Sequence, residues 1–130
     1  VIGTRTTRQM IEQDSNMGWF LRTGNIIFGK LIEVLWWNQE PRFTDVGCTF
    51  RGIWKDSYIK IRNNLNAPGP EFSPEMMIET LRAHLRVIEI PVSYHKRFGG
   101  DSKHSRGFKK IKTGFKMLNL ILNKKFGWKD

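Results

Sequence analysis

The chain has 130 residues, of which 39% are hydrophobic and 12% aromatic, so it is long and apolar enough to fold into one domain and is not a disordered segment. Its 22 basic and 12 acidic residues give a formal net charge of +10, which favours an anionic partner such as phosphates, a membrane surface or nucleic acid. The single cysteine, Cys48, excludes an internal disulfide and indicates a reducing compartment.

The first half of the chain predicts a strand, a helix and an extended segment. Residues 1–4 are typical of the end of a buried strand, and a chain that opens in this way is expected to be part of a longer protein. Apolar residues recur every three or four positions over residues 20–37, which predicts a helix that is apolar around most of its circumference and ends before Pro41. Residues 43–54 are rich in β-formers, which predicts a short strand or an extended segment.

The second half predicts a helix followed by a strand. The sequence Ser-Pro-Glu that begins at Ser73 is typical of a helix N-terminus with Ser73 as the cap, and this helix is expected to reach Leu85. Residues 86–94 predict a strand that Pro91 confines to a sheet edge or a bulge. Since strands and helices alternate along the chain, the pattern favours an α/β fold.

The last segment combines positive charge with helical periodicity. Residues 95–130 hold eleven Lys or Arg against two Asp, which is +9 of the net +10. Its apolar residues step by three and four along one stripe, formed by Phe108, Ile111, Phe115, Leu118 and Leu122. The lysines mostly fall outside this stripe, at Lys109, Lys110, Lys112 and Lys116. The pattern suits either a core helix or an amphipathic helix lying in an anionic membrane interface. No apolar run in the sequence reaches the roughly 18 residues needed to span a bilayer, and the most apolar window, residues 25–37, is interrupted by Lys30 and Glu33.

Four segments, in this order, resemble family 2 glycosyltransferases: VIGTR, FLRTGN, TDVGCTFR, and EFSPEMMIETLRAHLRVIEIPVSYHKRFGGDSK. The branch that they resemble most is the polyprenyl-phosphate (dolichyl-phosphate-like) mannosyl- and glucosyltransferases. The resemblance implies a GT-A fold, in which a mixed sheet is flanked by helices. Residues 1–106 would be the C-terminal, acceptor-side half of that domain, and residues 107–130 an amphipathic basic helix at the membrane. The family's nucleotide-binding half carries a metal-binding Asp-x-Asp, which is absent here, so a divalent metal (Mg or Mn) is expected only in the full-length enzyme.

The basic, glycine-containing loop at residues 95–106 contains the first candidate site residues. Read by composition alone, it is a solvated turn. The chemistry of its side chains also suits phosphate, because a guanidinium offers a planar fork and an ammonium a point charge. In the family, this segment is the acceptor loop that closes over phosphates, which implies phosphate-binding roles for Arg97, Ser102 and Lys103.

The resemblance assigns further residues to the lipid-phosphate pocket and to the floor of the active site. Arg5, Arg22 and Asn25 would bind the acceptor phosphate, the alternative being ordinary surface residues. Asp45 and Arg51 would organise the active-site floor, the alternative being a structural ion pair between them. Asp45 and Glu75 are the candidates for a catalytic base, although Glu75 is also favoured simply as an acid at a helix start.

The three histidines, His84, His95 and His104, have spacings that fit no local metal motif, so the chain is expected to supply no metal ligand. The function implied by the resemblance is inverting transfer of a sugar from a nucleotide sugar to a polyprenyl phosphate, at the cytoplasmic face of a membrane. The chain shown would be inactive alone. The alternative is a basic nucleic-acid-binding or membrane-interaction module without enzymatic activity, although no nucleic-acid partner is expected. The oligomeric state is left open, a homo-oligomer included.

Overall fold

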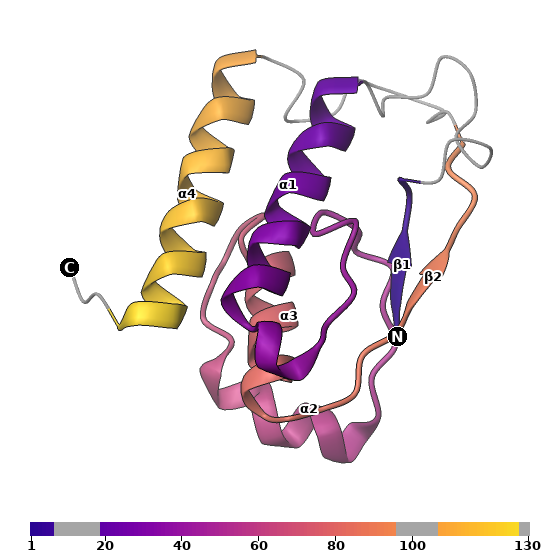
Figure 1. Cartoon of the computed structure of the whole chain (residues 1–130), viewed down its shortest axis with the longest axis vertical. Coiled ribbons are helices and arrows are strands. Elements are labelled where there is room, and N and C mark those ends of the chain that lie inside the picture. The colour runs from indigo at the N-terminus through magenta and orange to yellow at the C-terminus, as the bar shows by residue number, and fades with distance from the viewer. Residues whose placement is uncertain (7–18, 96–106, 128–130) are drawn as a thin grey trace.

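The computed structural model describes residues 1–6, 19–95 and 107–127, and the side chains of residues 107–110 lie outside that description. The described elements are, in chain order, β1 (Ile2–Thr4), α1 (Trp19–Leu35), η2 (Trp37–Gln39), α2 (Lys55–Ile61), η3 (Arg62–Asn64), α3 (Phe72–Arg82), β2 (Glu89–Pro91) and α4 (Gly107–Phe126). Helices α1, α3 and α4 pack together beside the two short strands (Figure 1). The expected α/β class is confirmed as a mixed, mainly helical fold with a small parallel sheet.

β1 is the central strand of this small sheet. On one side it pairs in parallel with β2, with Ile2 opposite Glu89 and Thr4 opposite Pro91. On the other side residues 50–52 run antiparallel to it, since the Gly3 amide donates to the Phe50 carbonyl at 2.8 Å and the Gly52 amide donates to the Val1 carbonyl at 3.0 Å. Strand directions of both kinds therefore meet on β1.

The prediction of a strand over residues 43–54 is wrong for most of that range. Only the isolated bridge between Ile2 and Arg51 is strand-like. The physical reason lies in residues 43–47, where four of the five backbone amides donate to carboxylate side chains instead of to a neighbouring strand. The expected placement of Pro91 on a sheet edge is confirmed. Ile88 and Val92 hydrogen-bond to β1, so the intervening Pro91 nitrogen, which has no hydrogen, lies on the outer side of β2.

α1 follows the predicted helix closely and packs one face on the core. Its buried residues Asn25, Gly29 and Ile32, followed by Trp36 just past its end, recur every three or four positions. Gly29 permits the closest approach, because a Cβ there would lie 2.7 Å from the Phe43 carbonyl oxygen. A helix as apolar as this one is expected to be buried or to lie against lipid. α1 is buried on one face only, and it keeps large apolar side chains exposed at Trp19, Phe20, Leu21, Ile27 and Val34.

α3 is the most deeply buried helix, and it differs from the prediction at both ends. It begins at Phe72, and the Ser73 hydroxyl does not cap it. That hydroxyl instead donates to the Val46 carbonyl and accepts a bond from Arg51, which ties α3 to the loop before residue 50. The helix ends at Arg82 instead of Leu85, and His84 then turns the chain with a positive φ of 54°.

α4 packs against α1 and α3 (Figure 1). Its buried side chains are Met117 and Ile121, and Ile121 belongs to the main core with Ile2, Ile32, Trp36, Phe43, Val46, Met77, Ile78 and Leu81. The predicted stripe lies on a different side of the helix. Phe115 is 68% exposed and Ile111 is also exposed, while Leu118 and Leu122 are half-buried. The alternative that this stripe forms a core face is therefore wrong.

Candidate functional site

A cluster of polar side chains lies at the carboxyl ends of β1 and β2, which meet at the same edge because the strands are parallel. Thr4 ends β1, and its hydroxyl forms a hydrogen-bonded triangle with the hydroxyls of Thr6 and Thr44, with oxygen separations of 2.8, 2.8 and 3.0 Å. All three residues are buried or half-buried. The chain between Thr4 and Thr6 is thus fixed on both sides of Arg5.

Arg5 and Asp45 form a bidentate ion pair in this cluster. The Arg5 Nε donates to Asp45 Oδ2 at 2.9 Å and Nη2 donates to Oδ1 at 3.0 Å. The Arg5 backbone amide and the Gly47 amide also donate to the same carboxylate. Burial by itself lowers the pKa of Arg5, but the hydrogen bonds and negative charge of Asp45 outweigh it and raise that pKa above its ordinary value. Arg5 is therefore a permanently charged cation with a fixed orientation.

Part of the Arg5 guanidinium still faces outward. The side chain is 18% exposed, whereas the Asp45 side chain is fully buried. Among the described residues, the Nη1 of Arg5 has no hydrogen-bond partner. The ring of Tyr94, just after β2, lies 5.5 Å from the Arg5 guanidinium carbon and adds a cation–π contact. The pair thus presents donor N–H groups from a fixed frame.

Asn25 and Arg22 of α1 approach the same cluster. The Asn25 side chain lies close to Gly47, because a Cβ added to Gly47 would be 2.8 Å from Asn25 Oδ1. The same Cβ would be 3.1 Å from Arg5 Nη2. The Arg22 Nε donates to the Thr6 carbonyl at 2.8 Å, and within the described part of the chain its two terminal nitrogens make no hydrogen bond. The structure therefore brings together four of the sequence-predicted residues: Arg5, Arg22, Asn25 and Asp45.

Glu89 is the residue of this cluster that the sequence analysis missed. Its carboxylate accepts bonds from the Thr44 amide at 2.8 Å, the Thr44 hydroxyl at 2.7 Å and the Asp45 amide at 3.1 Å. A signal was present in the sequence, because an acid within the apolar run VIEIPV must find partners if the strand is even partly buried.

Arg51 does not pair with Asp45, so the predicted alternative of an ion pair between them is wrong. Its guanidinium donates to the carbonyls of Cys48 and Ser73 at 3.0 and 2.6 Å, and to the Ser73 hydroxyl at 2.5 Å. Burial lowers the pKa of Arg51 to about 10, the nearby charges offsetting only part of that effect. Arg51 therefore connects the 46–48 loop to the start of α3.

Glu75 lies in a different cluster from Asp45. Its Oε2 accepts the backbone amides of Asn66 and Ala67 at 2.9 and 2.8 Å, and its Oε1 pairs with Lys124 of α4 at 3.1 Å. Lys124 also bonds Glu79 at 2.9 Å, and all three side chains are buried or largely so. Such buried, fully bonded carboxylates hold α4 and the preceding loop onto α3, and this arrangement offers no free base at Glu75.

Three of the predicted site residues lie outside the described residues, namely Arg97, Ser102 and Lys103, and so does His104. Within the part of the chain that the structure describes, no group of three His, Cys, Asp or Glu side chains could hold a metal ion. Within the same part, no helix is both long and apolar enough to cross a membrane.

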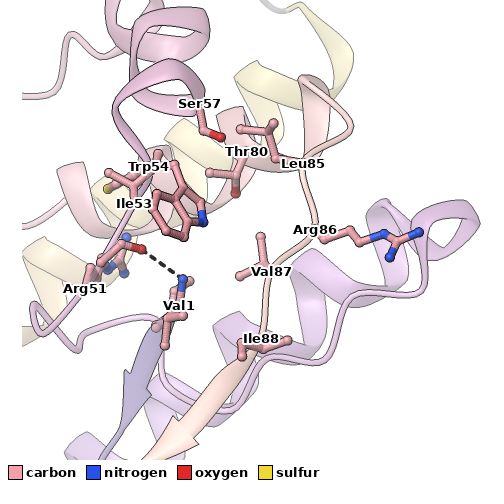
Figure 2. Close-up of a pocket in the computed structure, with 13 residues that line it drawn as sticks. Val1, Arg51, Ile53, Trp54, Ser57, Thr80, Leu85, Arg86, Val87 and Ile88 are labelled. Atoms are coloured by element: carbon pink, nitrogen blue, oxygen red, sulfur yellow. Dashed lines mark hydrogen bonds between the residues drawn. The ribbon is translucent and has the colours of Figure 1, made fainter.

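A pocket of about 530 Å³ lies at the opposite, amino end of the strands. Figure 2 shows the indole of Trp54 on one side of it and Leu85 and Val87 on another, with both strands running away from it. Trp54 is 85% exposed, and Ile88 beside it is also exposed. The lining is mainly apolar, and the Arg86 side chain points away from the space (Figure 2). This pocket offers a packing surface without an evident reacting group.

No protein-family model, curated protein or solved structure matches this chain.

Proposed function

We propose that this chain is the acceptor-side half of an inverting, family 2-like glycosyltransferase that transfers a sugar from a nucleotide sugar to a polyprenyl phosphate. The observation that carries the proposal is the Arg5–Asp45 pair with Arg22 beside it. The Arg5 guanidinium is held by Asp45, and the Arg22 guanidinium is held by the carbonyl of Thr6, the residue that follows Arg5, so both are fixed at the carboxyl end of β1. Their remaining N–H groups suit the oxygens of one phosphate.

The proposed chemistry needs positive charge more than a base. A phosphate oxygen is already ionised near neutral pH, so its attack on the anomeric carbon requires no strong proton acceptor. The Asp45 carboxylate accepts four hydrogen bonds from Arg5 and Gly47, so in this proposal it orients Arg5 and does not act as a base. Rate enhancement would come from positioning of the phosphate and from cations that balance its charge. The nucleotide sugar and a divalent metal would bind in the other half of a GT-A domain.

The apolar pocket at the amino end fits this proposal. Trp54 and Ile88 are large apolar side chains that line this pocket and are exposed. Further polypeptide of the same enzyme packing there would remove them from water. On this proposal the isolated chain has no transferase activity, because it would lack the nucleotide- and metal-binding half.

The exposed faces of α1 and α4 support action at the cytoplasmic face of a membrane. We name as the α1–α4 face the exposed apolar side chains that recur on these two helices: Phe20, Ile27, Val34, Ile111 and Phe115. Spacings of seven and four place them on one stripe of each helix. Each stripe borders the contact between the helices, where Phe28 approaches Gly114. Exposed Lys112 lies beside the α4 stripe, as expected for an interfacial helix.

A short polyprenyl phosphate such as farnesyl phosphate, in neutral detergent, tests the phosphate site. Arg5→Met and Arg22→Met should each raise its Kd by about tenfold, the worth of one charge-assisted hydrogen bond, while the dephosphorylated alcohol binds weakly to every variant. Arg86→Met is the matched control, because it removes an exposed arginine at the other end of the strands. Equal Kd values for all three variants would overturn the proposal.

Vesicles test the membrane surface separately. Phe115→Asp should weaken co-sedimentation with anionic vesicles, whereas Ile59→Asp, an equally abrupt change on exposed α2, should not. The rival nucleic-acid module predicts the opposite pattern: salt-dependent binding to generic DNA or RNA and no response to vesicles or farnesyl phosphate. A membrane module without enzymatic activity would bind vesicles but would not distinguish farnesyl phosphate from farnesol.

A further inference from the structure

The loop of residues 43–47 is shaped by two carboxylates from distant parts of the chain and by one of its own. Glu33 of α1 accepts the Phe43 amide at 2.6 Å, Glu89 of β2 accepts the amides of Thr44 and Asp45, and Asp45 accepts the Gly47 amide. Four of the five backbone amides are thereby held by negative side chains. Each carboxylate fixes a different part of the loop, so their roles can be separated by substitution.

Glu89 acts on the part of the loop that carries Asp45. It is half-buried, and within the described residues no Lys, Arg or His forms an ion pair with it. Among the residues that the structure describes, its two oxygens are bonded only to the two amides and to the Thr44 hydroxyl. A half-buried carboxylate is costly unless its hydrogen-bond donors stay in place. The donors therefore stabilise the charged Glu89, and Glu89 in turn fixes the positions of the donors.

We infer that Glu89 is a positioning residue for phosphate binding: by fixing the amides of Thr44 and Asp45, it aims the Asp45 carboxylate at Arg5 and so directs the free N–H groups of Arg5 outward. The inference rests on the proposed function for its ligand. Within the described residues Glu89 forms no hydrogen bond or ion pair with Arg5, so it acts through Asp45. Replacement of its carboxylate by an amide, which both donates and accepts, frees one side of the loop and lets Asp45 turn away.

The test compares Glu89→Gln with Glu33→Gln. Both replace a carboxylate that holds the same loop, but in the described part of the chain Glu33 bonds only Phe43 and Lys30 and makes no bond to Asp45. The first readout is the Arg5 Nε–H signal in nitrogen-edited NMR, which is sharp and protected from exchange when Asp45 holds it. The second readout is the Kd for farnesyl phosphate. Glu89→Gln should broaden or abolish the signal and raise the Kd by about tenfold, while Glu33→Gln should preserve both.

Each outcome decides a separate question. A protected Arg5 signal in Glu89→Gln, or equal loss in both variants, overturns the positioning role. A wild-type protein with a protected Arg5 signal and no affinity for farnesyl phosphate contradicts the proposed function, while the effect of Glu89→Gln on the signal still tests the positioning role. If Glu89→Gln does not fold, Glu89→Asp keeps the charge but shortens the reach by one methylene. That variant should weaken the Arg5 signal while Glu33→Asp leaves it intact, and an unchanged signal again overturns the role.

Discussion

The two ends of the β1–β2 pair are held together by different forces. At the carboxyl end, Arg5, Asp45 and Glu89 form a polar network in which each buried carboxylate has several donors. At the amino end, Trp54 and Val87 line an apolar pocket that remains open. Polar networks in a low-dielectric setting fix geometry because each unpaired group is costly, whereas apolar contacts tolerate many partners. The carboxyl end is therefore suited to chemistry, and the amino end to packing.

The largest effect should come from breaking the network. Asp45→Asn removes the charge that balances Arg5, and we expect the free energy of unfolding to fall by about 3 kcal/mol, at the low end for a broken buried pair because Arg5 keeps partial exposure. Urea denaturation measures this change. Arg5→Met in the same background should recover part of the loss, since no unpaired cation then remains. No recovery in the double variant would mean that the pair is not the source of the effect.

A second prediction uses one glycine from each end. Gly47→Ala would place a Cβ 2.8 Å from Asn25 and close to Arg5, so the network must shift, at a cost of about 1–3 kcal/mol of unfolding free energy. Gly52→Ala, in the wall of the amino-end pocket, meets no atom within 4 Å and should change stability by less than about 0.5 kcal/mol. Similar losses in the two variants, measured by urea denaturation, would remove the contrast between a tightly fitted end and an open one.

The smallest effect on stability is expected at the pocket itself. Trp54→Ala removes an 85% exposed side chain, so the free energy of unfolding should change by less than about 0.5 kcal/mol. Binding of a fluorescent apolar dye to the folded protein should nevertheless decrease, because the indole forms one side of the pocket. Ile59→Ala, an exposed apolar truncation outside the pocket lining, is the control. A marked loss of stability in Trp54→Ala would show that this end is already packed.

The helices were the most predictable part of the fold, because their signal is local. The spacing of apolar residues located α1 and α4, and Pro91 correctly indicated a strand on an edge. The prediction of a strand over residues 43–54 is wrong, because Glu33 and Glu89 accept the backbone amides that would otherwise bond a neighbouring strand. Both carboxylates are far from this segment in the sequence. α2 was not predicted at all.

Within the site, the sequence could name charged residues but could not pair them. The sequence offered Arg51 as a partner for Asp45, and only the folded chain shows that Arg5 pairs with Asp45 while Arg51 bonds carbonyls. Likewise, Glu75 had the spacing of a helix-start acid, but its partner Lys124 lies almost fifty positions later. Long-range pairing of this kind depends on how helices pack, which periodicity alone does not determine.

The Pro91 nitrogen on the outer side of β2 has a consequence for solubility. An open strand edge is a template on which another extended chain can add, which is a common first step in the growth of ordered aggregates. Because Pro91 supplies no donor on that side, the short outer edge of β2 offers an incomplete ladder to an incoming strand. Several aromatic residues of this protein are exposed, and contacts between them favour association. At this edge, however, the backbone lacks the regular row of donors that the growth of a fibril requires.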